Sequence, residues 1–417
     1  MPNRRTRGAA PYPDVEPWRP IRLVRVDVAA GGAGPDEGVA GYLPGDRVWI
    51  EVVRSGQVVR LVEARLDDGR LSEGLLGELS EAVAGEADDA RPVPDEQLAF
   101  ASIVVPTSGR RPRQLQTAVA SLDAIDYPDF EIVVVDNRTG EPTEALSFPD
   151  HPRVRVVRES LAGVSRARNR GVAATSGEFV AFTDDDTVVD AGWLRALGSR
   201  FAREPEVAAL GGLVLPSELE TEPQLWFEEY YGGFSQSFRR STVSRSLVRD
   251  DPLFPYAPGR FGAGCNMAFR RSALDELGGF DVTLGGGTPS KGGEDLAIFV
   301  RLMIGGGTMG FEPAALVRHT HRRSEEEFLT LVRDYGTGLM AMYTSIVLHD
   351  PRTILELVGR VPAGVRLLLQ RGRDRTPSKA STYPRRAFAW QLAGMAIGPI
   401  AYAHSWARAR RASEGHG

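Results

Sequence analysis

The hydrophobic pattern near the start of the chain alternates from residue to residue. Residues 21–28 (IRLVRVDV) place apolar and charged side chains in turn, as a half-buried strand does. Residues 48–53 and 57–64 repeat this alternation, and residues 71–83 follow with helical spacing. We therefore predict a small, mostly β domain over residues 19–86. The segment contains no catalytic grouping, which favours an accessory or docking module.

From residue 101 onward, continuous apolar runs alternate with helical spacing. The apolar runs predict buried strands at residues 103–105, 131–135, 154–157 and 179–182. Helical spacing separates these runs at residues 115–122 and 166–174. Strands that alternate with helices indicate a mainly parallel sheet, and the ligands of such sheets bind at the carboxyl ends of the strands. The predicted fold class is α/β.

The remaining segments differ from both patterns. Residues 1–18 carry basic side chains but no apolar run, so we interpret them as a disordered lead and not as a secretory signal. Asp, Glu, Ala and Pro dominate residues 87–99, which is typical of a linker. The α/β domain is then expected over residues 100–325, a basic helical region over residues 326–411, and a short tail over residues 412–417.

Polar side chains stand at the predicted carboxyl ends of three strands. They are Thr107, Asp136 with Asn137, and the run Asp184–Asp186. Three adjacent carboxylates repel one another, so a fold that buries them needs a counter-charge. A divalent cation with a bound diphosphate fits, because Mg²⁺ or Mn²⁺ binds carboxylate and phosphate oxygens together. The alternatives are a solvated acidic loop and, at Asp136, an Asx turn.

Arginines and a second pair of acids are the next candidates. Arg168 and its neighbours on the predicted helix surround Asn169, and a guanidinium that faces the sheet edge would pair with phosphate. Otherwise they form a solvated helix face. Glu294 and Asp295 follow two glycines at a predicted helix start. An acid there either caps the helix or takes a proton from an attacking hydroxyl.

Two histidines complete the candidate chemistry. His319 and His321 are two residues apart, so on a strand they would share a face. Because the aspartates need a partner, we expect one of the two to complete a metal site. A structural or exposed histidine is the alternative.

These segments resemble, in order, the motifs of family-2 glycosyltransferases. The motifs are SIVVPTSGR, VVVDN, GVSRARNRG, FVAFTDDDT, GAGCNMAFRRSAL, GGEDL and HTHR, between residues 102 and 323. The chain looks like an actinobacterial-type member with an extra N-terminal domain. The resemblance implies a GT-A fold, a Rossmann-like mixed sheet flanked by helices. It also implies an inverting, metal-assisted transfer of a sugar from a nucleotide sugar.

The resemblance also assigns roles to residues by position. The base and nucleotide pocket would involve Thr107, Arg110, Asp136 and Asn137, and the diphosphate would lie near Arg168 and Asn169. The DxD motif matches Asp184–Asp186, with Asp186 as the metal ligand, Asp184 or Asp185 at the ribose, and Asp184 as a second candidate ligand. Asp295 matches the catalytic base, supported by Glu294. His319 is the first choice for the metal-ligand histidine and His321 the second.

Residues 215–262 are rich in aromatic side chains, which stack on sugars but also build ordinary cores. We expect Trp226 and Tyr230, with Asn266 from the following motif, to shape the acceptor site. The QxxRW motif and long membrane spans of processive synthases are missing from the sequence. A single-sugar transfer to a glycan, lipid-linked or small-molecule hydroxyl is therefore favoured over polymer synthesis.

Composition and charge limit the partners and the cellular compartment that are expected for the protein. The chain has 417 residues with a net charge of −5, which argues against nucleic acid as a partner. Its single cysteine, Cys265, fits a reducing, cytoplasmic compartment. Residues 352–411 nevertheless hold eleven Arg and one Lys against two acids, a local net charge of +10.

This basic tail contains two apolar stretches, residues 354–369 and 387–407. We interpret both as helices that lie on an anionic membrane surface, at the inner face of the plasma membrane, with a cell-envelope acceptor. Helices packed on the catalytic domain, and a true membrane span, are the alternatives. For the α/β domain itself, two other functions compete with the transferase: a silent sugar-nucleotide or glycan-binding module, and a nucleotidyltransferase.

Overall fold

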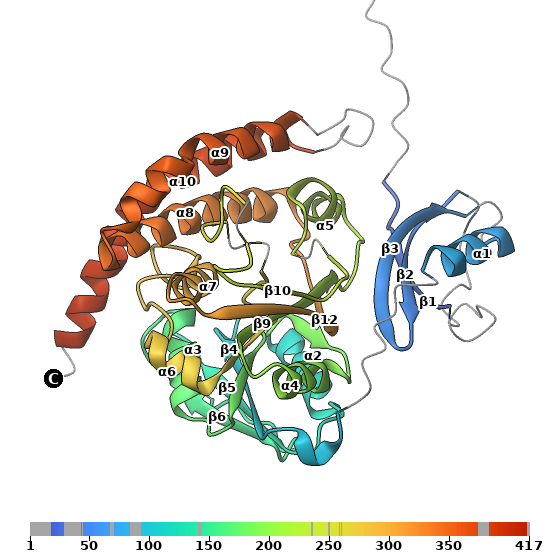
Figure 1. The fold of residues 1–417 in the computed structure, drawn as a ribbon, viewed down its shortest axis with the longest axis horizontal. Coiled ribbons are helices and arrows are strands. Elements are labelled where there is room, and N and C mark those ends of the chain that lie inside the picture. The colour runs from blue at the N-terminus through green and yellow to red at the C-terminus, as the bar shows by residue number, and fades with distance from the viewer. Residues whose placement is uncertain are drawn as a thin grey trace, which may run out of the picture.

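One large mixed sheet with helices on both faces carries a small separate sheet at one side and a layer of long helices at the other (Figure 1). A computed structural model describes residues 18–28, 43, 45–66, 71–83, 93–140, 144–234, 237–248, 251–257, 259, 261–373 and 383–414. Residues 1–17 of the predicted lead, residues 87–92 of the predicted linker and residues 415–417 of the predicted tail lie outside the described residues. The predicted class, α/β with a small β-rich N-terminal unit and C-terminal helices, is confirmed.

The first half of the large sheet is parallel, as the strand–helix alternation predicted. Its strands run in the order β6-β5-β4-β7. They are β4 (Ala101–Thr107), β5 (Phe130–Asp136), β6 (Val154–Arg158) and β7 (Phe179–Phe182), with α2 (Pro112–Asp123) and α3 (Val164–Ala173) between them. Pro112 opens α2, where its missing N–H costs no helical bond. Thr107, Asp136 and the acidic loop after β7 therefore share one edge of the sheet.

The second half of the sheet is mixed. Its elements are β8 (Thr187–Val189), α4 (Trp193–Arg203), β9 (Val207–Pro216), α5 (Glu222–Trp226), the π-helical turn η3 (Phe227–Tyr231), β10 (Ser241–Val243), β11 (Met267–Arg270), α6 (Arg271–Leu277), α7 (Glu294–Ile304) and β12 (Thr308–His319). Strand β11 lies antiparallel between β7 and β9, and β12 is parallel to β9. The short β8 pairs with the end of β12, which places His319 opposite Thr187, directly after the three aspartates.

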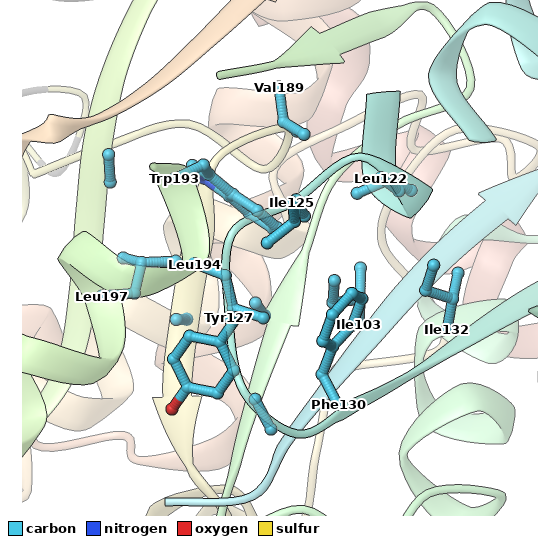
Figure 2. Packing of buried hydrophobic residues seen from close by; sticks show 14 of the residues in the cluster. Ile103, Leu122, Ile125, Tyr127, Phe130, Ile132, Val189, Trp193, Leu194 and Leu197 are labelled. Atoms are coloured by element: carbon cyan, nitrogen blue, oxygen red, sulfur yellow. The ribbon is translucent and has the colours of Figure 1, made fainter. Parts of the chain in front are cut away.

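The core fills both faces of this sheet. Successive residues of β4 point to opposite faces, so Ile103 packs in one cluster and Val104 in the other. Figure 2 shows the first cluster, where Trp193, Leu194 and Leu197 of α4 lie against strand residues such as Ile103. The polar loops of the carboxyl edge are thus held by strands that are buried on both sides.

The N-terminal unit is a three-stranded sheet with one helix. Strand β1 (Arg22–Asp27) pairs parallel with β2 (Arg47–Arg54), and β2 pairs antiparallel with β3 (Gln57–Arg65). Helix α1 (Glu73–Ala82) starts at Ser72, whose side chain accepts a hydrogen bond from the Leu75 N–H. The alternating pattern of the sequence therefore marked real strands.

This unit contacts the large sheet beside the end of β12. The buried Glu51 carboxylate on β2 receives both terminal nitrogens of Arg318 on β12, at 2.5 and 2.6 Å. Arg47 also reaches Glu229 of η3 at 2.9 Å. Apolar side chains of the two sheets share one cluster, which includes Val58 and Phe311. The accessory unit therefore braces the strand that ends in His319.

In its described residues the C-terminal region contains three long helices, and the two apolar stretches predicted as helices lie in the second and third of them. The three helices are α8 (Glu325–His349), α9 (Thr353–Arg373) and α10 (Arg386–Glu414). Gly336 on α8 and Gly394 and Gly398 on α10 let these two helices approach closely, because a Cβ at any of them would collide with the partner helix. Among the described residues, no helix combines the length and the apolar content that a bilayer crossing requires.

Candidate active site

A pocket of about 1190 Å³ opens at the carboxyl edge of the large sheet. Its walls include Thr107 at the end of β4, the acidic loop Asp184–Asp186 after β7, and His319 at the end of β12. The start of α7 adds Glu294 and Asp295. Residues from four separate stretches of the sequence thus meet in one cavity, at the sheet edge where the strand–helix alternation predicted a ligand site.

Asp185 lies inside the acidic loop and is buried. One of its carboxylate oxygens accepts a 2.6 Å hydrogen bond from the Thr107 hydroxyl. Burial raises the pKa of Asp185 to about 6, the hydrogen bond from Thr107 opposes this rise, and the charges of Asp186 and Asp184 add to it. A cation that enters the loop would favour the carboxylate form of this residue.

Asp186 is buried among nitrogen-bearing side chains. Its Oδ2 forms an ion pair with Arg111, at the start of α2, and lies 3.9 Å from a terminal nitrogen of Arg322. Its Oδ1 lies 3.5 Å from the Nε2 of His319. Part of the counter-charge that the three aspartates require is therefore supplied by arginines of the chain itself.

A chain of contacts orients His319. The Nε2 of His321 lies 2.5 Å from the carboxylate of Glu228, and the Nδ1 atoms of the two histidines are 3.2 Å apart. With Nε2–H of His321 donating to Glu228, its Nδ1 accepts the Nδ1–H of His319. Burial lowers the pKa of His319 well below its usual value, and the neighbouring His321 adds to this effect. His319 is then neutral, with the lone pair of Nε2 toward Asp186.

This arrangement fits a divalent cation. The lone pair of His319 Nε2 and the carboxylate of Asp186 are both acceptors, and a cation between them satisfies both. No three His, Cys, Asp or Glu side chains converge on one such point within the part of the chain that the structure describes. Two protein ligands are enough for an ion that also takes substrate phosphate oxygens and water.

The two acids at the start of α7 face different surroundings. Asp295 lines the pocket and accepts 2.8 Å hydrogen bonds from the backbone N–H groups of Gly264 and Leu296. Glu294 is buried and accepts a 2.8 Å hydrogen bond from Arg168. Burial raises the pKa of Glu294, the charge of Asp295 adds to the rise, and Arg168 opposes it. Both acids line the pocket, and Asp295 is the less buried of the two.

Arg168, which lines the pocket, connects the acidic loop to α7. Its side chain is buried and donates to Asp184 at 3.1 Å and to Glu294, and also to the backbone oxygen of Gly264 at 3.1 Å. A Cβ at Gly264 would lie 2.9 Å from Arg168 and 3.1 Å from Asp295. The absence of a side chain at Gly264 therefore lets both residues reach its backbone.

Comparison with known proteins identifies this arrangement. A family model described as glycosyl transferase family 2 matches residues 102–278, which contain the strands, the acidic loop and Arg168. Residues 102–278 therefore match a glycosyl transferase family 2 domain. Proteins similar to this chain include the pre-mycofactocin glycosyltransferase of Mycobacterium tuberculosis strain H37Rv, 28% identical over 209 residues. The succinoglycan biosynthesis protein ExoM of Rhizobium meliloti strain 1021 is 31% identical over 216 residues.

These similarities cover parts of the proteins. Each alignment spans 50% of this chain, with 41% of the first relative and 63% of the second. The chain thus spans about half the length of the curated relatives it matches. A solved structure with a similar fold is that of the mannosyltransferase PcManGT from Pyrobaculum calidifontis, in complex with GDP-Man and Mn²⁺. Its TM-score is 0.46 and its identity 16%, over 76% of this chain and 92% of that one.

Two residues assigned to the nucleotide by resemblance have other partners in this family-2 domain. Asp136 is buried and receives the guanidinium groups of Arg138, at 2.8 and 2.9 Å, and of Arg158, at 3.2 Å. Asn169 exchanges hydrogen bonds with the backbone of Phe280. Neither lines the pocket. Their side chains tie loops to strand and helix ends.

The predicted acceptor residues also need correction. Asn266 is 0% exposed, donates to two backbone oxygens and accepts from the Trp193 indole, so it cannot contact an acceptor. Trp226 is buried against Phe328 and Tyr383, away from the pocket. The side chain of Tyr230 lies outside the described part of the chain.

The remaining predicted residues line the pocket. They are Thr107, Arg110, Asn137, Arg168, Asp184, Asp185, Asp186, Glu294, Asp295, His319 and His321. Sequence reasoning missed Arg111, Arg322 and Glu228, which hold Asp186 and His321. The motifs SGRRPR and HTHRR carried a signal for the two arginines, since each places an arginine directly after a predicted site residue, Arg110 or His321. Nothing near Glu228 in the sequence indicated its contact with His321.

Proposed function

We propose that this family-2 domain transfers a single sugar from a nucleoside-diphosphate sugar to an acceptor hydroxyl, with inversion and with a divalent cation. The observation that carries the proposal is the placement of Asp295 and the Asp186–His319 pair in one pocket. A direct displacement needs a base beside the acceptor and positive charge beside the departing diphosphate. In this proposal Asp295 supplies the base, and a divalent cation held by Asp186 and His319 would supply the positive charge.

The donor end is assigned to the edge formed by β4, β7 and β12. Thr107, Arg110, Asp184 and Asp185 line this edge of the pocket. In the proposal Thr107 and Arg110 contact the nucleoside, and Asp184 or Asp185 contacts the ribose. Asp186 and His319 would hold Mn²⁺ or Mg²⁺, which when bound neutralises charge on the diphosphate oxygens.

The acceptor end is assigned to the start of α7. Asp295 takes the proton of the acceptor hydroxyl, and the oxygen of that hydroxyl forms a bond to the anomeric carbon of the donor sugar. The bond from that carbon to the diphosphate breaks, and the nucleoside diphosphate leaves with the bonding electrons. Asp295 keeps free lone pairs for this step, because the N–H groups of Gly264 and Leu296 occupy only one on each oxygen.

A thermal-shift panel tests the donor half of the proposal. UDP, GDP, dTDP and CDP sugars are each added with and without Mn²⁺ or Mg²⁺. At about 100 times its Kd, a true donor stabilises the fold by about 2.7 kcal/mol. We expect one nucleotide class to raise Tm only with metal, and Asp186→Ala to abolish this shift. Asp150→Ala, at an exposed site away from the pocket, is the matched control. A shift that survives Asp186→Ala would remove Asp186 from the site.

We also propose that the C-terminal helices bind an anionic membrane surface. Helix α10 packs its small residues on α8 and exposes Trp390, Ile397, Ile400 and Trp406. No charged side chain interrupts residues 387–407, and arginines flank both ends. This pattern is typical of helices that lie in the lipid interface. The alternative, that these helices pack on the catalytic domain, explains only the face of α10 that contacts α8.

Vesicle sedimentation tests the membrane proposal. We expect the protein to pellet with phosphatidylglycerol vesicles and to remain in the supernatant with phosphatidylcholine vesicles, with binding weakened by high salt. Ile397→Glu should release it, since a charge would enter the apolar face. Leu247→Glu, at an apolar residue exposed elsewhere, is the control and should bind normally. Equal pelleting of both variants would exclude the α10 face.

A further inference from the structure

The pocket is larger than a nucleotide sugar requires. Its volume of about 1190 Å³ exceeds the 300–1,000 Å³ that is usual for small-ligand sites. Beyond Asp295 it continues between α8 and α9. There its walls include Leu253, Leu339, Leu357 and Val361. We refer to this second part of the pocket, between α8 and α9, as the apolar arm.

Polar groups in the wall of the apolar arm are already paired. The Tyr343 hydroxyl donates to the backbone oxygen of Tyr256 at 2.6 Å. The Tyr256 hydroxyl lies 3.2 Å from Glu356, and Arg360 lies over the Tyr256 ring while donating to backbone oxygens of Phe254 and Glu356. Because these groups are already hydrogen-bonded, few donors or acceptors are left for a polar ligand. The arm therefore suits a hydrocarbon chain better than a second sugar.

The apolar arm opens to the outside along α9. Val358, Val361 and Val365 line the arm and are at the same time 62, 56 and 49% exposed. One turn earlier on the helix, Leu355 is exposed as well. Helices α9 and α10 both contact α8, and Figure 1 shows both on the side of α8 that faces away from the large sheet. The arm thus connects the apolar surface proposed to meet the membrane with the carboxylate of Asp295.

We infer that the acceptor is lipid-linked and that its hydrocarbon chain lies in the apolar arm between α8 and α9. This inference rests on the proposed transferase function and adds the substrate class. The acceptor hydroxyl lies at Asp295, and the chain reaches the membrane surface beside α9. An apolar chain that enters sideways from a bilayer does not have to cross water, so its binding costs little desolvation.

Gly364 offers a direct way to block the arm. It lines the arm, and a Cβ added there would meet only Leu253, at 3.9 Å, so a side chain at this position points into open space. Gly359 lies on the same helix, does not line the pocket, and has nothing within 4 Å of an added Cβ. Replacing a helical glycine by a residue with a Cβ favours the helix in both cases. The two positions form a matched pair.

The test uses cis-parinaric acid, an 18-carbon fluorescent fatty acid, titrated into the full-length protein without vesicles. We expect saturable binding that farnesyl phosphate displaces and methyl β-glucoside does not. Gly364→Trp should raise the Kd of the probe about tenfold or more, while Gly359→Trp changes it less than about twofold. Gly364→Ala leaves the arm open and should bind as the wild type does. Melting curves confirm that each variant is folded.

The outcomes distinguish a failure of the lipid-acceptor inference from a failure of the proposed transferase function. Equal effects of Gly364→Trp and Gly359→Trp, or the absence of saturable binding, would overturn the apolar arm while the metal-dependent nucleotide shift remains. If no nucleotide sugar raises the Tm of the wild-type protein in the presence of metal, the transferase proposal is overturned instead. If the arm is correct, Gly364→Trp keeps the nucleotide shift and loses only the lipid probe.

Discussion

Replacing Asp295 by asparagine is expected to lower kcat by about 10²–10⁴-fold, the range over which a positioned general base contributes. The amide is nearly isosteric, and its oxygen can still accept the hydrogen bond from the Gly264 N–H. It cannot take a proton from an acceptor hydroxyl. Donor binding should survive, since the acidic loop and His319 are unchanged. The effect should therefore fall on the chemical step.

The measurement separates catalysis from binding. The rate of sugar transfer at saturating donor is compared with the metal-dependent thermal shift of the same variant. Asp275→Asn, at an exposed site on α6, is the matched control and should match the wild type in both assays. An Asp295→Asn enzyme with an unchanged kcat would show that another group takes the proton. A variant without the nucleotide shift would indicate a lost fold or donor site, and its rate would not report on the base.

The sequence predicted the parallel half of the sheet because its strands are buried on both faces. A strand covered on both sides reads as a continuous apolar run, and polar residues at its end stand out. Thr107 and Asp184–Asp186 were found in this way. The order of the strands was less accessible, because β11 enters antiparallel between β7 and β9 from a stretch that is distant in sequence.

The errors arose where a side chain is satisfied by a distant partner. Asn266 looked available to a substrate, yet its amide donates to Leu213 and Ala315 and accepts from Trp193, residues 49 to 73 positions away. Asp136 was assigned to the nucleotide by resemblance to a family motif. Its carboxylate is taken by two arginines, one of them 22 residues further along. Such partnerships depend on tertiary packing, which periodicity does not encode.

The same limit applies to the apolar arm. Its walls come from the loop around Leu253 and from helices α8 and α9, whose apolar residues looked like ordinary core or membrane-facing residues. What the sequence provided was the unusual charge and hydrophobicity of the tail. The sequence did not show that residues of this tail and Asp295 line the same pocket.

Arg168→Gln is expected to destabilise the fold by about 3–5 kcal/mol, the usual cost of removing one partner of a buried ion pair. Arg168 is buried between Asp184 and Glu294, and Asp295 is close enough to add to its electrostatic surroundings. Without the guanidinium these carboxylates lose their counter-charge. Arg170→Gln, at an exposed site on the same helix, should change stability by less than about 0.5 kcal/mol. Urea unfolding measures both values.

The pH dependence of this loss identifies its cause. The pKa of Glu294 is raised to about 7 in the folded protein, mainly by burial, against an ordinary value of 4.5. A carboxyl group with a raised folded-state pKa favours folding when protonated, and this contribution is lost as pH rises through the folded value. Removing Arg168 should raise that pKa further, because the opposing charge is gone. The deficit of Arg168→Gln should therefore be larger at pH 8 than at pH 5, and Glu294→Gln in the same chain should recover part of it at pH 8. A deficit that does not change with pH would point to lost packing instead of unpaired charge.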